Sequence, residues 1–99
     1  MRISSVEADK VKTAAERCFG AGTVVRLFGS RADDARRGGD IDLQIIAADE
    51  AAVSLDGELK FRAALEDEIG EQRIDLELRK STDPERPIDV IARSTGIIL

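Results

Sequence analysis

The stretch RLFGSRADDARRGGDIDLQII, residues 26–46, contains two apolar runs, a Gly-Ser pair and two aspartates one residue apart. The runs TVVRLF (23–28) and DIDLQIIA (40–47) are short and rich in β-branched and apolar residues, which predicts two strands. Asp40 and Asp42 stand in the second strand, where the alternating residues are apolar. Two carboxyl groups in a strand that is otherwise typical of a protein interior require an explanation.

Two helices are predicted on either side of this stretch. Serines suited to capping precede the first helix, over residues 5–19, and Gly20 ends it. The second helix lies within DGELKFRAALEDEIG (56–70) and ends at Gly70. The first helix has its apolar residues near helical spacing at Val6, Val11, Ala14, Ala15 and Cys18. The second is expected to bury Leu59, Phe61, Ala63, Leu65 and Ile69.

The C-terminal third completes the pattern. QRIDLELR (72–79) alternates apolar and polar residues, which indicates a half-buried strand, and PIDVIARS (87–94) can begin a short helix at its proline. The order α-β-β-α-β-α predicts a single α+β (α/β) domain over residues 1–99, with helices packed on a small mixed sheet. The final residues IIL (97–99) pack either on the core or on a partner.

The composition excludes several classes of site. The chain has no histidine, tyrosine or tryptophan and a single cysteine, Cys18, which is best interpreted as a small buried apolar side chain. Histidine-based catalysis and zinc sites built from histidine or several thiolates are therefore excluded. A metal here must be bound by oxygen ligands, which indicates magnesium, calcium or manganese.

Charge and hydropathy bear on partners and location. The net charge of −5 argues against direct binding of duplex nucleic acid, which favours basic surfaces. The N-terminal residues lack the apolar segment of a signal peptide, and no apolar run approaches membrane-spanning length. We therefore expect a cytoplasmic protein with no membrane association.

Strand geometry gives the aspartates a common direction. Residues i and i+2 of a strand point to the same face, so Asp40 and Asp42 project together while Ile41 and Leu43 face the core. A divalent cation relieves the repulsion between two such carboxylates. If the strand RIDLEL (73–78) is adjacent, Asp75 completes a three-carboxylate cluster that can hold two metal ions about 4 Å apart. Glu77, on the same face of that strand, is the alternative third acid.

The Gly-Ser pair predicts a contact with phosphate. Gly29 follows a strand directly, and a glycine there allows backbone N–H groups to approach a ligand closely. Ser30 adds a hydroxyl group, and a helix that begins near Arg31 directs its positive end to the same point. Arg36 and Arg37 are interpreted as solvated loop charges. A phosphate cradle beside an acidic metal site is what phosphoryl and nucleotidyl transfer require.

These residues resemble the DNA polymerase beta-like nucleotidyltransferase superfamily. The superfamily signature has an apolar residue followed by Gly-Ser, a spacer, Asp-x-Asp on a strand, and a third acid on a later strand. Here it reads Phe28-Gly29-Ser30, then Asp40-Ile41-Asp42, then Ile74-Asp75-Leu76. The length and the helix before the first strand are similar to its smallest branch, the minimal nucleotidyltransferases.

The resemblance implies a function as well as a fold. It implies an enzyme that uses Mg²⁺ or Mn²⁺ to transfer AMP from ATP to a hydroxyl of a partner protein. By the same resemblance, Asp40, Asp42 and Asp75 are expected to bind metal and perform catalysis, and Gly29, Ser30 and Arg31 to bind the nucleotide. Members of this branch are often antitoxins encoded beside a helical HEPN-type toxin, which implies a hetero-oligomer with such a partner.

The segment between the two halves of the motif departs from this branch. Members commonly carry a glycine soon after the Gly-Ser segment and a serine before the first aspartate, where this chain has RADDARR (31–37) and Gly39. The departure leaves an alternative, a non-catalytic antitoxin that neutralises a helical partner by contact. A third hypothesis is that the protein is a calcium or magnesium sensor, which predicts metal binding without ATP binding.

Overall fold

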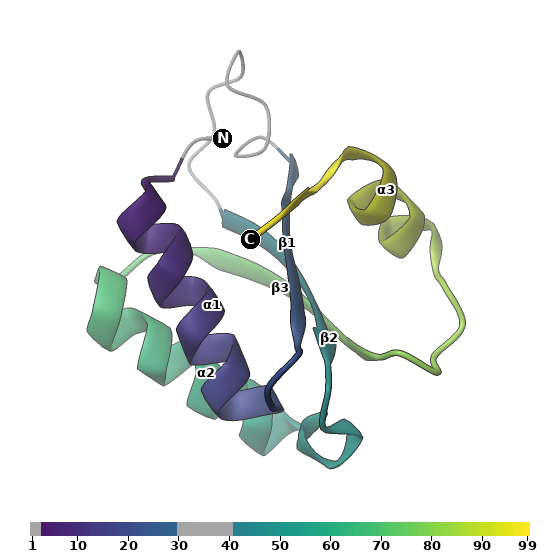
Figure 1. Ribbon diagram of the computed structural model, residues 1–99, viewed down its shortest axis with the longest axis horizontal. Coiled ribbons are helices and arrows are strands. Elements are labelled where there is room, and N and C mark those ends of the chain that lie inside the picture. Colours follow the sequence, from purple (N-terminus) through teal and green to yellow (C-terminus); the bar gives the residue numbers. More distant parts are fainter. Residues whose placement is uncertain (1–2, 30–40) are drawn as a thin grey trace.

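The computed structural model describes residues 3–29 and 41–99, which form an α+β domain of three α-helices and a four-stranded mixed sheet (Figure 1). This confirms the predicted fold class. The helices are α1 (Ser5–Phe19), α2 (Leu55–Ile69) and α3 (Pro87–Thr95), and the 3-10 helix η2 (Glu50–Ala52) precedes α2. The strands are β1 (Val24–Phe28), β2 (Ile41–Ala47), β3 (Ile74–Lys80) and β4 (Ile97–Ile98).

Local capping fixes the two long helices. At the start of α1, the Ser4 hydroxyl accepts a hydrogen bond from the Glu7 backbone N–H, and the Glu7 carboxylate accepts one from the Ser4 backbone in return. The Ser54 hydroxyl caps α2 by accepting a hydrogen bond from the Gly57 backbone N–H. Gly20 and Gly70 end the two helices with positive φ angles, as the sequence predicts.

The sheet has the strand order β3-β2-β1-β4. The pair β2–β3 is parallel, with α2 in the connection, whereas β1 pairs antiparallel with both β2 and β4. Because β1 runs opposite to β2 and β3, the end of β1 and the beginnings of β2 and β3 lie at one edge of the sheet. The described parts of the predicted motif, Phe28-Gly29, Ile41-Asp42 and Ile74-Asp75-Leu76, therefore meet there.

Each face of the sheet has its own helical cover (Figure 1). On one face, α1 and α2 enclose the core, where the rings of Phe19 and Phe61 lie 5.6 Å apart against Ile41, Leu43 and Ile45. On the opposite face, the Gln44 amide of β2 donates a hydrogen bond to Asp89 of α3, and both side chains are buried. The faces are thus chemically different: one is apolar, and the other carries buried polar groups.

Two expectations about burial are wrong. Leu59 and Ala63 of α2 are exposed. At 100° per residue, Leu59 lies about 200° from both Gly57 and Phe61, which α2 buries. The leucine therefore points away from the core. Apolar identity alone does not decide which face of a helix packs.

The C-terminal residues pack on the domain's own sheet, which decides between the two alternatives for IIL. The strand β4 pairs with β1, and the Leu99 N–H donates to the Val25 carbonyl at 2.9 Å. Leu99 also contacts the core cluster.

Candidate functional site

The structure places Asp42 and Asp75 side by side. The parallel register pairs Asp42 of β2 with Asp75 of β3, and the antiparallel register pairs Phe28 of β1 with the same Asp42. Residues directly opposite each other on neighbouring strands point to the same face, with the strands about 4.8 Å apart. The two carboxylates therefore share one face at the edge of the sheet where β1 ends.

Alternation along β2 gives Asp42 its direction. Its neighbours Ile41 and Leu43 are buried in the core beneath α1 and α2. Asp42, which is half-buried, projects from the opposite face, and Asp75 beside it is exposed. The predicted direction of Asp42, away from the core, is confirmed. A half-buried acid beside an exposed one can be reached by a ligand from solvent.

Gly29 borders this acid pair directly. Its φ angle is +71°, in the region that favours glycine, and a β-carbon at this position would lie 2.1 Å from Oδ2 of Asp42. No larger residue fits there without displacing the carboxylate. The glycine thus allows the backbone after β1 to approach the acid closely. The predicted contact of Gly29 with phosphate stays a prediction.

The two alternatives for the third acid occupy different positions. Glu77 is paired in register with Gln44, one strand repeat away from Asp42. Its Oε2 accepts a hydrogen bond of 2.9 Å from the Arg86 guanidinium, which also forms an ion pair with it. Asp75 is therefore the acid that lies beside Asp42, whereas Glu77 contacts Arg86 at the start of α3.

A polar network that the sequence analysis missed lies next to the acid pair. Arg26 donates to the Gln44 Oε1 at 2.8 Å, and the Gln44 amide donates to Asp89 at 3.1 Å. Arg86 contacts the same Asp89 through its backbone N–H and its side chain, at 2.9 and 3.1 Å. Two polar residues within apolar segments could have indicated this network from the sequence: Gln44 in the apolar run of β2, and Asp89 in the segment PIDVIA.

Asp89 is charged within this network although only 1% of it is exposed. Burial raises its pKa, but the hydrogen bonds from Arg86 and Gln44 outweigh that effect and lower the pKa to about 2. A buried carboxylate with these donors attaches α3 to the face of the sheet that also carries the acid pair. Its role is to hold the fold at this edge.

Three predicted site residues, Asp40, Ser30 and Arg31, lie outside the described residues, as do Arg36 and Arg37. Within residues 3–29 and 41–99, no group of three aspartate, glutamate, cysteine or histidine residues is arranged to hold a metal ion. The described part of the site is therefore a pair of acids, Asp42 and Asp75. Two adjacent carboxylates that solvent can reach are chemically suited to Mg²⁺ or Mn²⁺.

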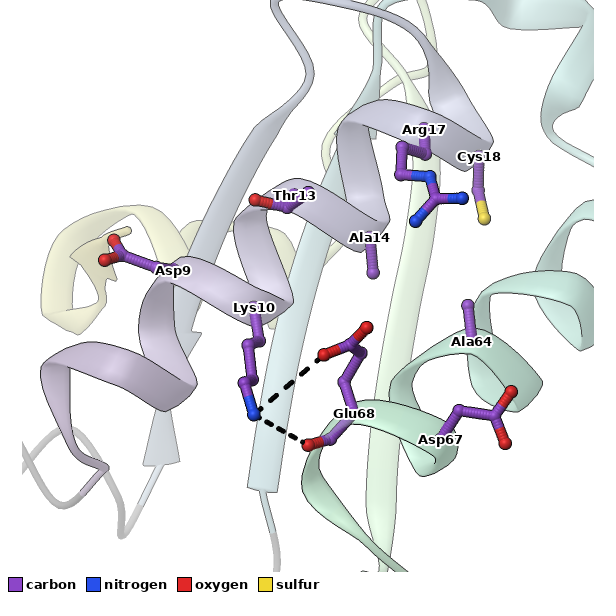
Figure 2. Close-up of a pocket in the computed structure, with 9 residues that line it drawn as sticks. All are labelled: Asp9, Lys10, Thr13, Ala14, Arg17, Cys18, Ala64, Asp67 and Glu68. Atoms are coloured by element: carbon purple, nitrogen blue, oxygen red, sulfur yellow. Dashed lines mark hydrogen bonds and ion pairs between the residues drawn. The ribbon is translucent and has the colours of Figure 1, made fainter.

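A separate groove of about 460 Å³ lies between α1 and α2, on the other side of the sheet (Figure 2). Lys10 spans it, donating to the Glu68 carbonyl at 3.1 Å and forming an ion pair with the Glu68 carboxylate at 3.9 Å. Cys18, half-buried against the core, lies at one end, so its predicted burial is only partial. The groove shares no residue with the acid pair.

Comparison with protein-family models gave no match, and comparison with curated proteins gave no significant match.

Proposed function

We propose that this protein is a metal-dependent nucleotidyltransferase that transfers AMP from ATP to a hydroxyl group of a partner protein. One observation carries the proposal: Asp42 and Asp75 are in register on neighbouring parallel strands, and Gly29 lies against Asp42. An acid pair next to a closely approaching backbone suits the recognition of a metal-bound triphosphate.

The proposed reaction joins the acceptor oxygen to the α-phosphorus of ATP. The bond from this phosphorus to the bridging oxygen breaks, pyrophosphate leaves, and the acceptor hydroxyl loses its proton. Asp42, with Asp40 from the sequence motif, holds the metal, and Asp75 completes the site and accepts or directs the proton. Bound there, Mg²⁺ or Mn²⁺ supplies charge neutralisation for the triphosphate. Gly29 and Ser30 orient the phosphates.

The proposed biological setting follows from the resemblance to minimal nucleotidyltransferases. It is an antitoxin that modifies a helical HEPN-type partner in the cytoplasm and forms a hetero-oligomer with it. In residues 3–29 and 41–99, no helix is both long and apolar enough to cross a membrane. The net negative charge further disfavours duplex nucleic acid as the acceptor.

The decisive experiment separates catalysis from neutralisation by contact. The protein is incubated with Mg²⁺, ATP labelled at the α-phosphate, and the HEPN-type protein encoded beside it. We expect label on the partner with the natural chain and with the control Asp56→Ala, an exposed acid of α2. No label should appear on the partner when Asp42→Ala replaces the natural chain. No label should appear either when the ATP is labelled at the γ-phosphate, because that phosphate leaves with pyrophosphate.

Growth of cells that express the partner gives the second readout. If Asp42→Ala still neutralises the partner without transferring label, the essential mechanism is contact, and the non-catalytic antitoxin replaces the enzyme as the function.

A further inference from the structure

Arg26 of β1 is a half-buried arginine that has no carboxylate partner within residues 3–29 and 41–99. Its guanidinium donates a hydrogen bond of 2.8 Å to Oε1 of Gln44, which is a neutral amide oxygen. Arg86, in the same polar network, is instead paired with the carboxylates of Glu77 and Asp89. Arg26 is therefore the arginine of this network whose charge is left for a ligand.

Strand register places Arg26 diagonally across from Asp42. Phe28 is directly opposite Asp42, and Arg26, two residues earlier on β1, is directly opposite Gln44. All four side chains therefore belong to the face of the sheet that α3 contacts through Gln44. A diagonal neighbour on an adjacent strand lies about 7–8 Å away, which is within reach of a long side chain. The cation thus lies beside the acid pair.

A buried carboxylate fixes the orientation of the Gln44 amide. Asp89, whose pKa is lowered to about 2, is ionised at neutral pH and can only accept hydrogen bonds. The NH₂ end of Gln44 therefore faces Asp89, at 3.1 Å, and the oxygen end faces Arg26. The guanidinium is thus held in place before a ligand arrives, which reduces the cost of ordering it on binding.

We propose that Arg26 binds a phosphate group of the nucleotide held at the acid pair, with Gln44 and Asp89 as positioning residues. This inference rests on the proposed function, because it requires a metal-bound triphosphate at Asp42 and Asp75. The opposite face of the sheet is covered by α1 and α2, so the triphosphate lies over the face that carries Arg26. A guanidinium can donate two parallel, charge-assisted hydrogen bonds to the oxygens of one phosphate.

A purely electrostatic role, in which Arg26 only balances the charge of the acid pair, predicts a different result. Removal of a cation beside two carboxylates reduces the repulsion of a metal ion. Arg26→Gln should therefore bind Mn²⁺ alone at least as tightly as the natural chain does. If the arginine binds phosphate, the same variant should bind the complex of Mn²⁺ with ATP at least about tenfold more weakly. Charge balance alone does not predict this loss.

Electron paramagnetic resonance of free Mn²⁺ and isothermal titration with ATP measure the two affinities. Arg93→Gln is the matched control, because it removes the same charge from an exposed position on α3, where Arg93 pairs with Glu85. The control should match the natural chain in both measurements. Tripolyphosphate with Mn²⁺ is the second probe, and Arg26→Gln should bind it more weakly by the same factor. A loss with ATP alone would assign the arginine to the base or ribose and overturn the proposal.

Failure of this inference and failure of the proposed function give different results. If the natural chain does not bind ATP with Mn²⁺, the proposed function fails and the inference falls with it. If the natural chain binds and Arg26→Gln binds equally well, or if Arg26→Gln loses the binding of Mn²⁺ alone, only the inference is overturned. Circular dichroism checks folding. Arg26→Lys, which keeps the charge without the planar pair of donors, should recover part of the lost affinity.

A double-mutant cycle tests the positioning role of Gln44. Gln44→Met removes the acceptor with little change in size, and should weaken the binding of Mn²⁺–tripolyphosphate when Arg26 is present. In the Arg26→Gln background the same substitution should have no further effect, because the group that Gln44 positions is absent. An equal loss in both backgrounds would mean that Gln44 acts only on the fold, and would overturn its role as a positioning residue.

Discussion

Gly29 lies so close to the carboxylate of Asp42 that a β-carbon at position 29 would stand 2.1 Å from Oδ2. This contact joins the end of β1 to the beginning of β2, although the two residues are 13 positions apart in the sequence. The register then extends the site to Asp75 on β3. Three strands thus place a closely approaching backbone and two carboxylates at one edge of the sheet.

Substitution of this glycine should damage the site and the fold together. In Gly29→Ala, the positive φ costs roughly 1–2 kcal/mol, and the new methyl group also displaces the Asp42 carboxylate. Gly70→Ala is the control, because it has a φ of +83° but no atom within 4 Å of the added carbon. Urea unfolding should show the larger loss in Gly29→Ala, and only this variant should lose metal-dependent ATP binding. Equal behaviour of the two variants would show that the contact with Asp42 has no consequence.

Asp75 and Glu77 should differ in their effect on metal binding. Asp75→Asn removes the carboxylate beside Asp42 and should weaken Mn²⁺ binding by about tenfold or more, which corresponds to about 1.4 kcal/mol. Glu77→Gln disturbs only the contact with Arg86 and should leave the affinity within about twofold. Electron paramagnetic resonance of free Mn²⁺ measures both affinities. If Glu77→Gln weakened Mn²⁺ binding more than Asp75→Asn did, Glu77 would be the acid that completes the site.

Stability at low pH should depend on Asp89. Its pKa is about 2 in the folded protein against 3.8 ordinarily, so its contribution is present above pH 4 and is lost as the pH falls towards 2. The shift corresponds to roughly 2 kcal/mol. We expect Asp89→Asn to be destabilised by about that amount at pH 7, and the difference from the natural chain to shrink as the pH approaches 2. Urea titrations at several pH values measure it, and a constant difference would refute the linkage.

The two faces of α2 should respond differently to polar substitution. Leu59 is 55% exposed, so Leu59→Gln should change the free energy of unfolding by no more than about 0.5 kcal/mol. Phe61 is fully buried against Phe19, and Phe61→Ala should cost about 3–5 kcal/mol. Thermal or urea unfolding compares the two variants. A large loss in Leu59→Gln would mean that this leucine belongs to the core.

Local signals in the sequence predict most of the elements. Serine caps and terminal glycines define α1 and α2, and the alternation in RIDLEL identifies β3 because its pattern depends only on near neighbours. The direction of Asp42 follows from the same alternation, since Ile41 and Leu43 must face the core.

Features that depend on distant partners could not be predicted in this way. The alignment of Asp42 with Asp75 rests on the parallel register of β2 and β3, which no local pattern specifies. The exposure of Leu59 depends on the rotation of α2 about its axis relative to α1 and the sheet. The two-residue β4 forms through its pairing with β1, which is distant in the sequence. The partnership of Gln44 with Asp89 likewise joins residues 45 positions apart.

The most direct test of the central claim is the binding of ATP with and without metal. Isothermal titration should show binding to the natural chain in Mg²⁺ or Mn²⁺ and at least about tenfold weaker binding in EDTA. Asp42→Asn should reduce the metal-dependent binding to the level in EDTA, whereas Asp56→Asn should leave it unchanged. Binding of ATP that is equally strong in the natural chain and in Asp42→Asn, or no binding with either metal, would contradict the assignment of this acid pair as a metal–nucleotide site.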